Sequence, residues 1–202
     1  SDLALKGSLL SEAGNAHLGI GKHGDNFTGH IESAGFNLRQ VLNDDKFGTI
    51  ATNIDIDGNL KRKLIKARGT VNRFDYNGYS YRNITLDGQW LNGLYNGIFD
   101  INDQNIIAKI KGTLNTQVNN TSAKLTADIE HFAPATLNLF NGKFANNTYS
   151  ANIVADFAGR SLNTANGKLA INHLSVHMPS ANYALDSLRL SAGTNKHGHF
   201  IT

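Results

Sequence analysis

The feature that most constrains this chain is an alternation of apolar and polar residues with a period of two. Residues 83–90, NITLDGQW, place aliphatic residues, glycine or tryptophan at the even positions and polar side chains at the odd positions. Successive side chains point to opposite sides only along an extended strand, so this pattern predicts a strand with one apolar and one wet face. Because the same alternation recurs along most of the chain, we expect an all-β protein.

Turn residues separate these alternating segments. The chain contains 26 Asn, 20 Gly and only 2 Pro. Asn and Gly tolerate the positive φ angles of tight hairpin turns. We therefore expect turns at Asn77-Gly78, Asn92-Gly93 and Asp57-Gly58, the last followed by a strand from Leu60 to Val71. The predicted fold is a mainly antiparallel meander, curled into a groove-like sheet, although a closed sandwich is also compatible with the pattern.

Two segments depart from the alternation. Residues 37–43, NLRQVLN, have apolar residues at helical spacing, which predicts a short helix that packs Leu38 and Leu42 against the sheet. Residues 135–141 show a similar pattern and predict a second short helix.

These two segments belong to a repeated order of residues. Ile31-Glu32 and the motifs that follow recur from Ile129-Glu130, at offsets of 98 to 102 residues. We interpret residues 1–30 as the leading strands of a preceding repeat, 31–128 as one β-repeat unit and 129–202 as a second, truncated unit. Because the alternation begins almost at the first residue, we expect an internal piece of a larger, elongated repeat protein.

The sequence offers little for catalysis. It lacks cysteine, a Gly-x-Ser-x-Gly motif and a phosphate-binding loop, and no pair of carboxylates is singled out for glycoside chemistry. We therefore predict a non-enzymatic protein without cofactors.

A metal site is not expected either. The pair His173 and His177 lies in a predicted strand, where four residues span about 13 Å, too far to share an ion. The pair His197 and His199 is interpreted as solvated. The acidic turn around Asp55 lacks the spacing of an EF-hand calcium loop, and the one around Asp100 lacks the glycine of such a loop.

The net charge is +3, and the only basic cluster is Lys61-Arg62-Lys63, followed by Lys66 and Arg68. We interpret it as a solvated strand face, with nucleic acid or lipid headgroups as the alternative, and expect no nucleic acid partner. Aromatic residues gather at Phe74, Tyr76, Tyr79, Tyr81, Trp90, Tyr95 and Phe99. Their simplest role is cross-strand packing, and the functional alternative is a platform for sugar or acyl chains.

The apolar positions of the predicted strands define one candidate site. Because a slip of one residue would turn a whole strand over, these positions should share one continuous concave face. Such a face suits phospholipid acyl chains, since it requires no specific hydrogen bonds. The predicted lipid-binding groove comprises Ile50, Ile54, Ile56, Ile84, Leu86, Trp90, Ile106, Ile110, Leu125, Ile129, Ile153, Phe157, Leu188 and Leu190.

Three motifs carry a resemblance to a known group of proteins. They are Tyr76-Asn77-Gly78-Tyr79 with Ile84, Leu86 and Gly88; the run Gly97–Asp103; and the run Ile110–Asn115. In this order they resemble the repeats of AsmA-like and TamB-like envelope proteins, over most of residues 27–190.

The resemblance implies an internal segment of a large, inner-membrane-anchored protein that crosses the periplasm of a Gram-negative cell. Its apolar β-groove would bind or conduct phospholipid for outer-membrane biogenesis and assembly. The implied partners are phospholipid acyl chains, flanking repeats of the parent protein and an outer-membrane assembly protein, and no catalytic residue is implied. The alternative function is a surface-exposed β-rich binding module, carbohydrate-binding or adhesive, with Trp90 and tyrosines stacked on sugar rings.

Overall fold

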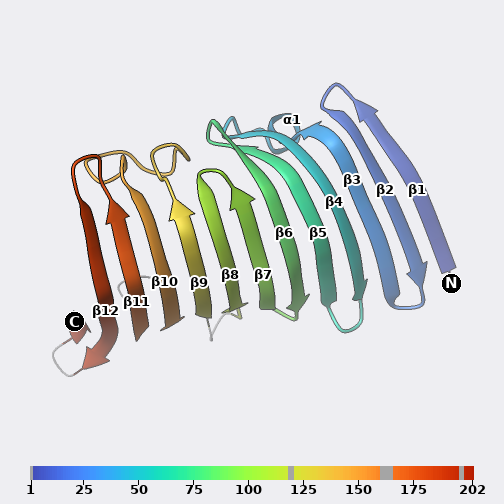
Figure 1. Cartoon of the computed structure of the whole chain (residues 1–202). Coiled ribbons are helices and arrows are strands. Elements are labelled where there is room, and N and C mark those ends of the chain that lie inside the picture. The colour runs from blue at the N-terminus through green and yellow to red at the C-terminus, as the bar shows by residue number, and fades with distance from the viewer. Residues whose placement is uncertain (1, 118–120, 160–165, 196–197) are drawn as a thin grey trace.

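The computed structural model describes residues 2–117, 121–159, 166–195 and 198–202. In these residues, 13 strands form one antiparallel sheet in which every strand pairs with its neighbours in sequence (Figure 1). The all-β meander predicted from the alternation is thereby confirmed. The strands are β1 (Asp2–Ser11), β2 (Gly14–His23), β3 (Asn26–Asn37), β4 (Phe47–Asn59), β5 (Leu64–Tyr76), β6 (Tyr79–Leu91), β7 (Leu94–Asp103), β8 (Ile106–Asn115), β9 (Ser122–Phe132), β10 (Thr148–Ala158), β11 (Asn166–His177), β12 (Asn182–Asn195) and β13 (Gly198–Ile201).

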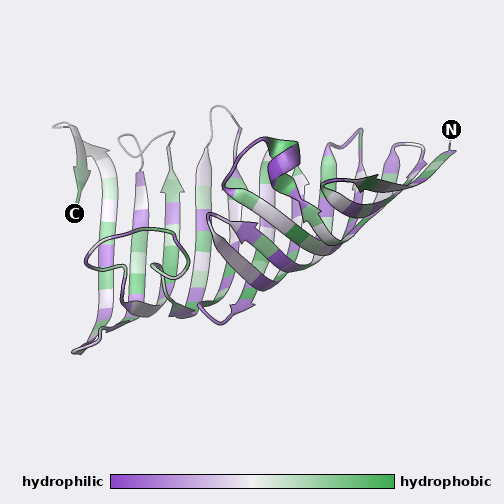
Figure 2. Ribbon diagram, turned by 90° about the horizontal axis from the view of Figure 1, so that it is seen from above, coloured by the Kyte–Doolittle hydropathy of each residue, from purple (hydrophilic) through white to green (hydrophobic). Residues whose placement is uncertain are grey.

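The sheet is a single layer. Viewed from above, it is a bent and twisted ribbon of strands, and within the described residues no second sheet lies on either face (Figure 2). It does not close on itself, because β1 and β13 pair with nothing but β2 and β12. The described part of the chain is therefore an open sheet, and it continues without a break across the predicted unit boundaries at residues 30 and 128.

One of the two predicted helices is present. Helix α1 (Leu38–Leu42) begins at Asn37, whose side-chain oxygen accepts a hydrogen bond from the Arg39 N–H, and ends at Asn43 in the left-handed conformation. The expected packing of Leu42 on the sheet is wrong, because its side chain is 52% exposed. The helix lies in the connection between β3 and β4, beside the ends of these strands (Figure 1).

The second helix, predicted at residues 135–141, is wrong. This segment is a series of turns whose backbone bonds have mixed spacing: Leu137 donates to Ala133, Asn138 to Ala135 and Leu139 to Pro134. The mixture arises because Asn138 has a φ of 54°, which interrupts an α-helix after one turn.

The hairpin turns follow the predicted chemistry at two of three sites. Asn77 and Gly78 have φ angles of 50° and 80°, and Asn92 and Gly93 have 48° and 87°, as type I′ turns require. The turn expected at Asp57-Gly58 is wrong: both residues lie inside β4, and the chain turns at residues 60–63. Gly58 serves packing instead, since a Cβ there would lie 2.5 Å from the Phe27 ring.

The strand connections lie on two opposite rims of the sheet. We call the rim that carries helix α1 the α1 rim; it also holds the connections after β1, β5, β7, β9 and β11 (Figure 1). The other rim, which carries the turn at residues 60–63 between β4 and β5, is called the Leu60 rim.

The best-buried side chains gather near the α1 rim. Leu137 is fully buried, and Pro134 and Ala145 lie beside it in the connection between β9 and β10. This connection is held by the β5–β6 hairpin, because Asn77 Nδ2 donates to the Asn138 carbonyl at 2.5 Å and the Tyr81 hydroxyl donates to the Leu137 carbonyl at 3.3 Å. The hairpin thus extends past β7 and β8 to reach the segment 133–147.

Asp103 secures that extended hairpin. Asp103 is only 3% exposed, and its carboxylate accepts hydrogen bonds from the Tyr79 hydroxyl, from the Arg82 N–H at 3.0 Å and from the Asn105 N–H at 2.9 Å. A buried carboxylate is stable only when such donors compensate its lost hydration. Asp103 therefore ties the end of β6 to the β7–β8 turn.

We predict that Asp103→Ala lowers the free energy of unfolding by about 2–4 kcal/mol, because it leaves buried donors without an acceptor. Denaturant unfolding followed by circular dichroism measures the loss. The control is Asp100→Ala, which removes an exposed carboxylate 3.6 Å from Lys109 Nζ and should cost less than about 1 kcal/mol. Equal losses in the two variants would contradict the role given to Asp103.

Alkaline pH should weaken the same junction. Burial, and then the hydrogen bond to Asp103, raise the pKa of the Tyr79 hydroxyl above its ordinary value. The folded state therefore favours the protonated tyrosine, and this contribution is present below the unfolded pKa of about 10 and is lost as pH rises through the higher folded value. Stability should fall above pH ~10, and less steeply in Tyr79→Phe; an unchanged slope in that variant would show that Tyr79 contributes nothing.

Candidate functional site: an uncovered apolar face

The strand register aligns apolar residues into rows that run across the sheet. Directly opposed residues in an antiparallel pair lie on the same face, so a row can be followed from strand to strand. The central row contains no charged residue from β2 to β12. Its members are Leu18, Ile31, Ile54, Gly69, Leu86, Phe99, Ile110, Ala127, Ile153, Ile171 and Leu188.

Two further rows continue this face towards the Leu60 rim. The middle one is Leu5, Ile20, Gly29, Ile56, Ala67, Gly88, Gly97, Gly112, Leu125, Ala155, Leu169 and Leu190. The outer one is Leu3, Lys22, Phe27, Gly58, Ile65, Trp90, Tyr95, Leu114, Ala123, Phe157, Gly167, Ala192 and Ile201. Lys22 is the one charged residue in the three rows, which together we call the apolar face.

The residues predicted for the groove lie on this one side of the sheet. Most belong to the three rows, while Ile50, Ile84, Ile106 and Ile129 continue the same face towards the α1 rim. None of the predicted residues is buried; each is half-buried or exposed. Leu188, for example, is 38% exposed and Trp90 37%. The inner faces of a closed sandwich would be buried, so the described residues leave this face without a cover.

The prediction missed other members of the same face. Leu18, Ile20 and Phe99 are exposed large apolar residues in its rows, and so are Leu3, Leu5 and Leu114. Their own strands alternate with the same period, so the sequence signal that identifies Ile54 and Leu86 could also have identified them.

The opposite face is mainly polar, although Leu10 and Val154 are exposed on it, and it carries cross-strand ion pairs. Each of them joins directly opposed residues: His30 and Asp55 at 2.7 Å, Arg68 and Asp87 at 2.8 Å, Lys124 and Asp156 at 2.9 Å. Exposed pairs of this kind contribute at most about 1 kcal/mol each. Their arrangement nevertheless distinguishes the two faces, because charged side chains of this kind are stable where they contact water.

Aromatic rings on the apolar face cover glycines. A Cβ on Gly97 would lie 2.3 Å from the Tyr95 hydroxyl oxygen, and one on Gly88 would lie 3.0 Å from it. The Tyr95 ring therefore lies across two neighbouring strands, and this burial raises the pKa of its hydroxyl. Glycine at these positions makes room for a ring.

The aromatic residues singled out in the sequence separate into two groups. Phe74, Tyr76, Tyr79 and Tyr81 form a packed cluster with Phe47 near the α1 rim, with ring centroids 4.8–6.4 Å apart. Tyr95 and Phe99 form a separate pair at 6.4 Å on the apolar face. Cross-strand packing explains the first group. The second pair lies in the rows of the apolar face, and so does Trp90, the remaining aromatic residue, which is opposed to Tyr95.

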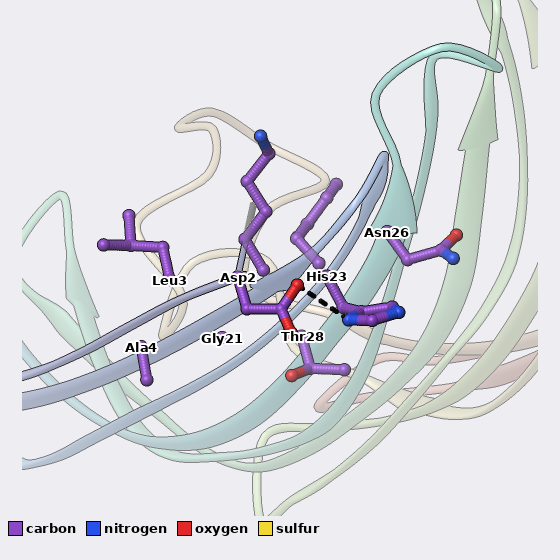
Figure 3. Close-up of a pocket in the computed structure, with 9 residues that line it drawn as sticks. Asp2, Leu3, Ala4, Gly21, His23, Asn26 and Thr28 are labelled. Carbon is purple, nitrogen blue, oxygen red and sulfur yellow. Dashed lines mark ion pairs between the residues drawn. The ribbon is translucent and has the colours of Figure 1, made fainter.

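A shallow depression of about 520 Å³ lies at the Leu60 end of β1, β2 and β3 (Figure 3). The ion pair between His23 and Asp2, at 2.8 Å, borders it, while Leu3 points to the other side of the sheet from Ala4 and Thr28. Both ionic side chains are largely exposed, so this depression has no enclosed site for chemistry.

The described residues contain no group of three or more His, Asp or Glu side chains that could hold a metal ion. His173 and His177 both lie in β11, in agreement with the strand predicted there, whereas His197 lies outside the described residues. In this part of the chain, no helix has the length and apolar character needed to cross a membrane.

Comparisons with known proteins identify no relative. No protein-family model, no curated protein and no solved structure matches the chain.

Because the apolar face is exposed, truncating a leucine on it should reduce the free energy of unfolding less than truncating a buried leucine does. Leu137→Ala, at a fully buried position, should lower the free energy of unfolding by about 2–5 kcal/mol through lost burial and a cavity. Leu188→Ala, on the apolar face, should cost less than about 1.5 kcal/mol, because the side chain already contacts water. Chemical denaturation of the monomeric protein compares the two. Similar costs would mean that something covers Leu188 in solution.

Proposed function

We propose that the apolar face binds the acyl chains of phospholipids. The single observation that carries the proposal is the set of three rows of apolar residues and glycines that cross the sheet, in which many of the large side chains are half-exposed or exposed and Lys22 is the one charged member. An exposed apolar surface of this extent marks an interaction site, because water contact with so many aliphatic groups is unfavourable.

The shape of the face supports a chain-like ligand. Neighbouring strands lie about 4.8 Å apart, so a row that crosses twelve strands is roughly 50 Å long. Along each strand the three rows together span about 13 Å, close to the ~15 Å depth of one acyl layer in a bilayer. Each methylene removed from water contributes about 0.8 kcal/mol, with no need for a hydrogen-bonding partner. The face would therefore accept lipids by their acyl chains.

We further propose that the chain is a non-catalytic segment of a large periplasmic envelope protein of the AsmA-like and TamB-like kind. The motifs around Tyr76–Gly88, Gly97–Asp103 and Ile110–Asn115 support this assignment, as does the open meander, which can continue at either side. In that setting the further neighbours of the outermost strands, β1 and β13, would be strands of flanking repeats. An outer-membrane assembly protein would be a further partner.

The alternative, a carbohydrate-binding or adhesive module, requires aromatic rings that stack on sugars amid hydrogen-bonding groups. Trp90 instead lies between Ile65 and Tyr95 in the outer row of the apolar face. This position supports the lipid proposal over the sugar proposal.

The test is photo-crosslinking with matched positions on the two faces. A photoreactive amino acid at Ile54, Leu86 or Ile110, all in the central row, should capture radiolabelled phospholipid presented in vesicles. The controls are Asn53, Thr85 and Lys109, each one residue away on the same strand and aligned in one row of the polar face. We expect labelling at least tenfold stronger on the apolar face. Equal labelling of both faces, or none on either, would overturn the proposal.

A further inference from the structure

The sequence pattern predicted that the basic cluster Lys61, Arg62 and Lys63 lies on a solvated strand face. This prediction is wrong, because the three residues form the turn between β4 and β5. All three side chains are exposed, and none takes part in an ion pair within the described residues. Three adjacent cations without a carboxylate repel one another, so a turn of this composition has capacity for an anion.

Hydrogen bonds between neighbouring turns hold this basic turn in place. The Leu60 N–H donates to the Asp25 carbonyl at 2.8 Å, and the Asn92 N–H donates to the Lys63 carbonyl at 3.2 Å. Lys63 itself has a φ of 51°, a left-handed conformation that closes the turn. The turn is therefore tied on both sides to the adjacent turns of the Leu60 rim.

The basic turn directly adjoins the outer row of the apolar face. Gly58 and Ile65, which flank the turn on β4 and β5, are opposed to each other in that row, and Ile65 is 47% exposed. Lys22 lies in the same row, opposite Phe27 on β3, and also lines the shallow depression at this rim. The apolar face and the positively charged turn are thus separated by only a few residues.

The two rims differ in charge. Among the described residues, the connections on the Leu60 rim carry the three cations of the basic turn and a single acid, Asp25, and Lys22 adds a fourth cation on the adjoining row. The connections on the α1 rim balance their charges, with Glu12, Asp44 and Asp45 against Arg39, Lys46 and Lys143. An anion attached to an apolar chain would therefore be attracted to the Leu60 rim and not to the α1 rim.

We propose that the turn of Lys61, Arg62 and Lys63, together with Lys22, binds the phosphate of a phospholipid whose acyl chains lie on the apolar face. This inference rests on the proposed function and adds to it an orientation and a headgroup class. Ammonium and guanidinium groups donate charge-assisted hydrogen bonds to phosphate oxygens. The acyl chains would extend from the Leu60 rim along β4 and β5, across the three rows.

The same cations could also take free phosphate, and the experiment separates the two sources. Trp90 is the only tryptophan of the chain and lies in the outer row, opposite Ile65, so its emission reports acyl chains on the apolar face. The protein is titrated with short-chain phosphatidylglycerol below its micelle concentration, and separately with an uncharged alkyl glycoside of the same chain length. A blue shift of the Trp90 emission gives each dissociation constant.

The test variant is the triple substitution K61Q/R62Q/K63Q. We expect it to weaken binding of phosphatidylglycerol about tenfold at low salt, with the difference shrinking as salt is added, and to leave alkyl glycoside binding unchanged. The control is K6Q/K111Q/K168Q, which removes the same charge from the polar face and should alter neither constant. Equal loss of affinity in both triple variants would assign the effect to net charge and overturn the headgroup site.

The remaining outcomes distinguish the two proposals. Unchanged phosphatidylglycerol affinity in K61Q/R62Q/K63Q would overturn the headgroup site while leaving acyl binding intact. No blue shift with either amphiphile would overturn acyl binding itself, and the inference with it. Calorimetry with inorganic phosphate completes the test: free phosphate should bind at least a hundredfold more weakly than phosphatidylglycerol, and comparable affinity would assign the turn to free phosphate instead.

Discussion

The ladder of hydrogen bonds between neighbouring strands is the interaction on which this structure depends. Each inner strand pairs its backbone with the strand before and the strand after it, and within the described residues no second layer adds a core. The fully buried side chains are few and lie near the α1 rim, around Leu137. Cross-strand contacts on each face supplement the ladder by up to about 1 kcal/mol per pair. Regular alternation therefore matters along most of each strand, although the ladders tolerate local register shifts, as between Ala51 and Thr52 in β4.

This constraint explains what the sequence could predict. Alternation fixes the side of each residue, so the grouping of Ile54, Leu86 and Ile110 could be read from the chain without knowledge of the register. The two Asn-Gly turns could also be predicted from the sequence, because both residues favour positive φ angles. The same reasoning failed at Asp57-Gly58, because a glycine beneath the Phe27 ring looks like a turn glycine in sequence. It failed at residues 135–141 because Asn138 adopts a left-handed conformation that helical spacing alone does not reveal.

The absence of a cover over the apolar face was beyond sequence reasoning, because a closed sandwich and an open sheet share one alternation pattern. Only the register of all the strands shows that the described residues place their aliphatic rows side by side and leave them uncovered. The same register places Lys22 and the basic turn along one border of that surface. In the described residues the sheet is therefore asymmetric in two ways: one face is apolar and the other mainly polar, and the connections of the Leu60 rim have a net positive charge whereas those of the α1 rim balance their charges.

The neighbour-only pairing of the strands has a consequence for how the chain folds. Every strand finds its partners within a short sequence distance, apart from the longer connections at residues 38–46 and 133–147. Contacts of this kind favour rapid formation, and a hairpin formed anywhere can extend strand by strand in both directions. Unfolding should accordingly begin at the outermost strands, β1 and β13, whose amide hydrogens would exchange with solvent first, while those of β5 and β6 would exchange last.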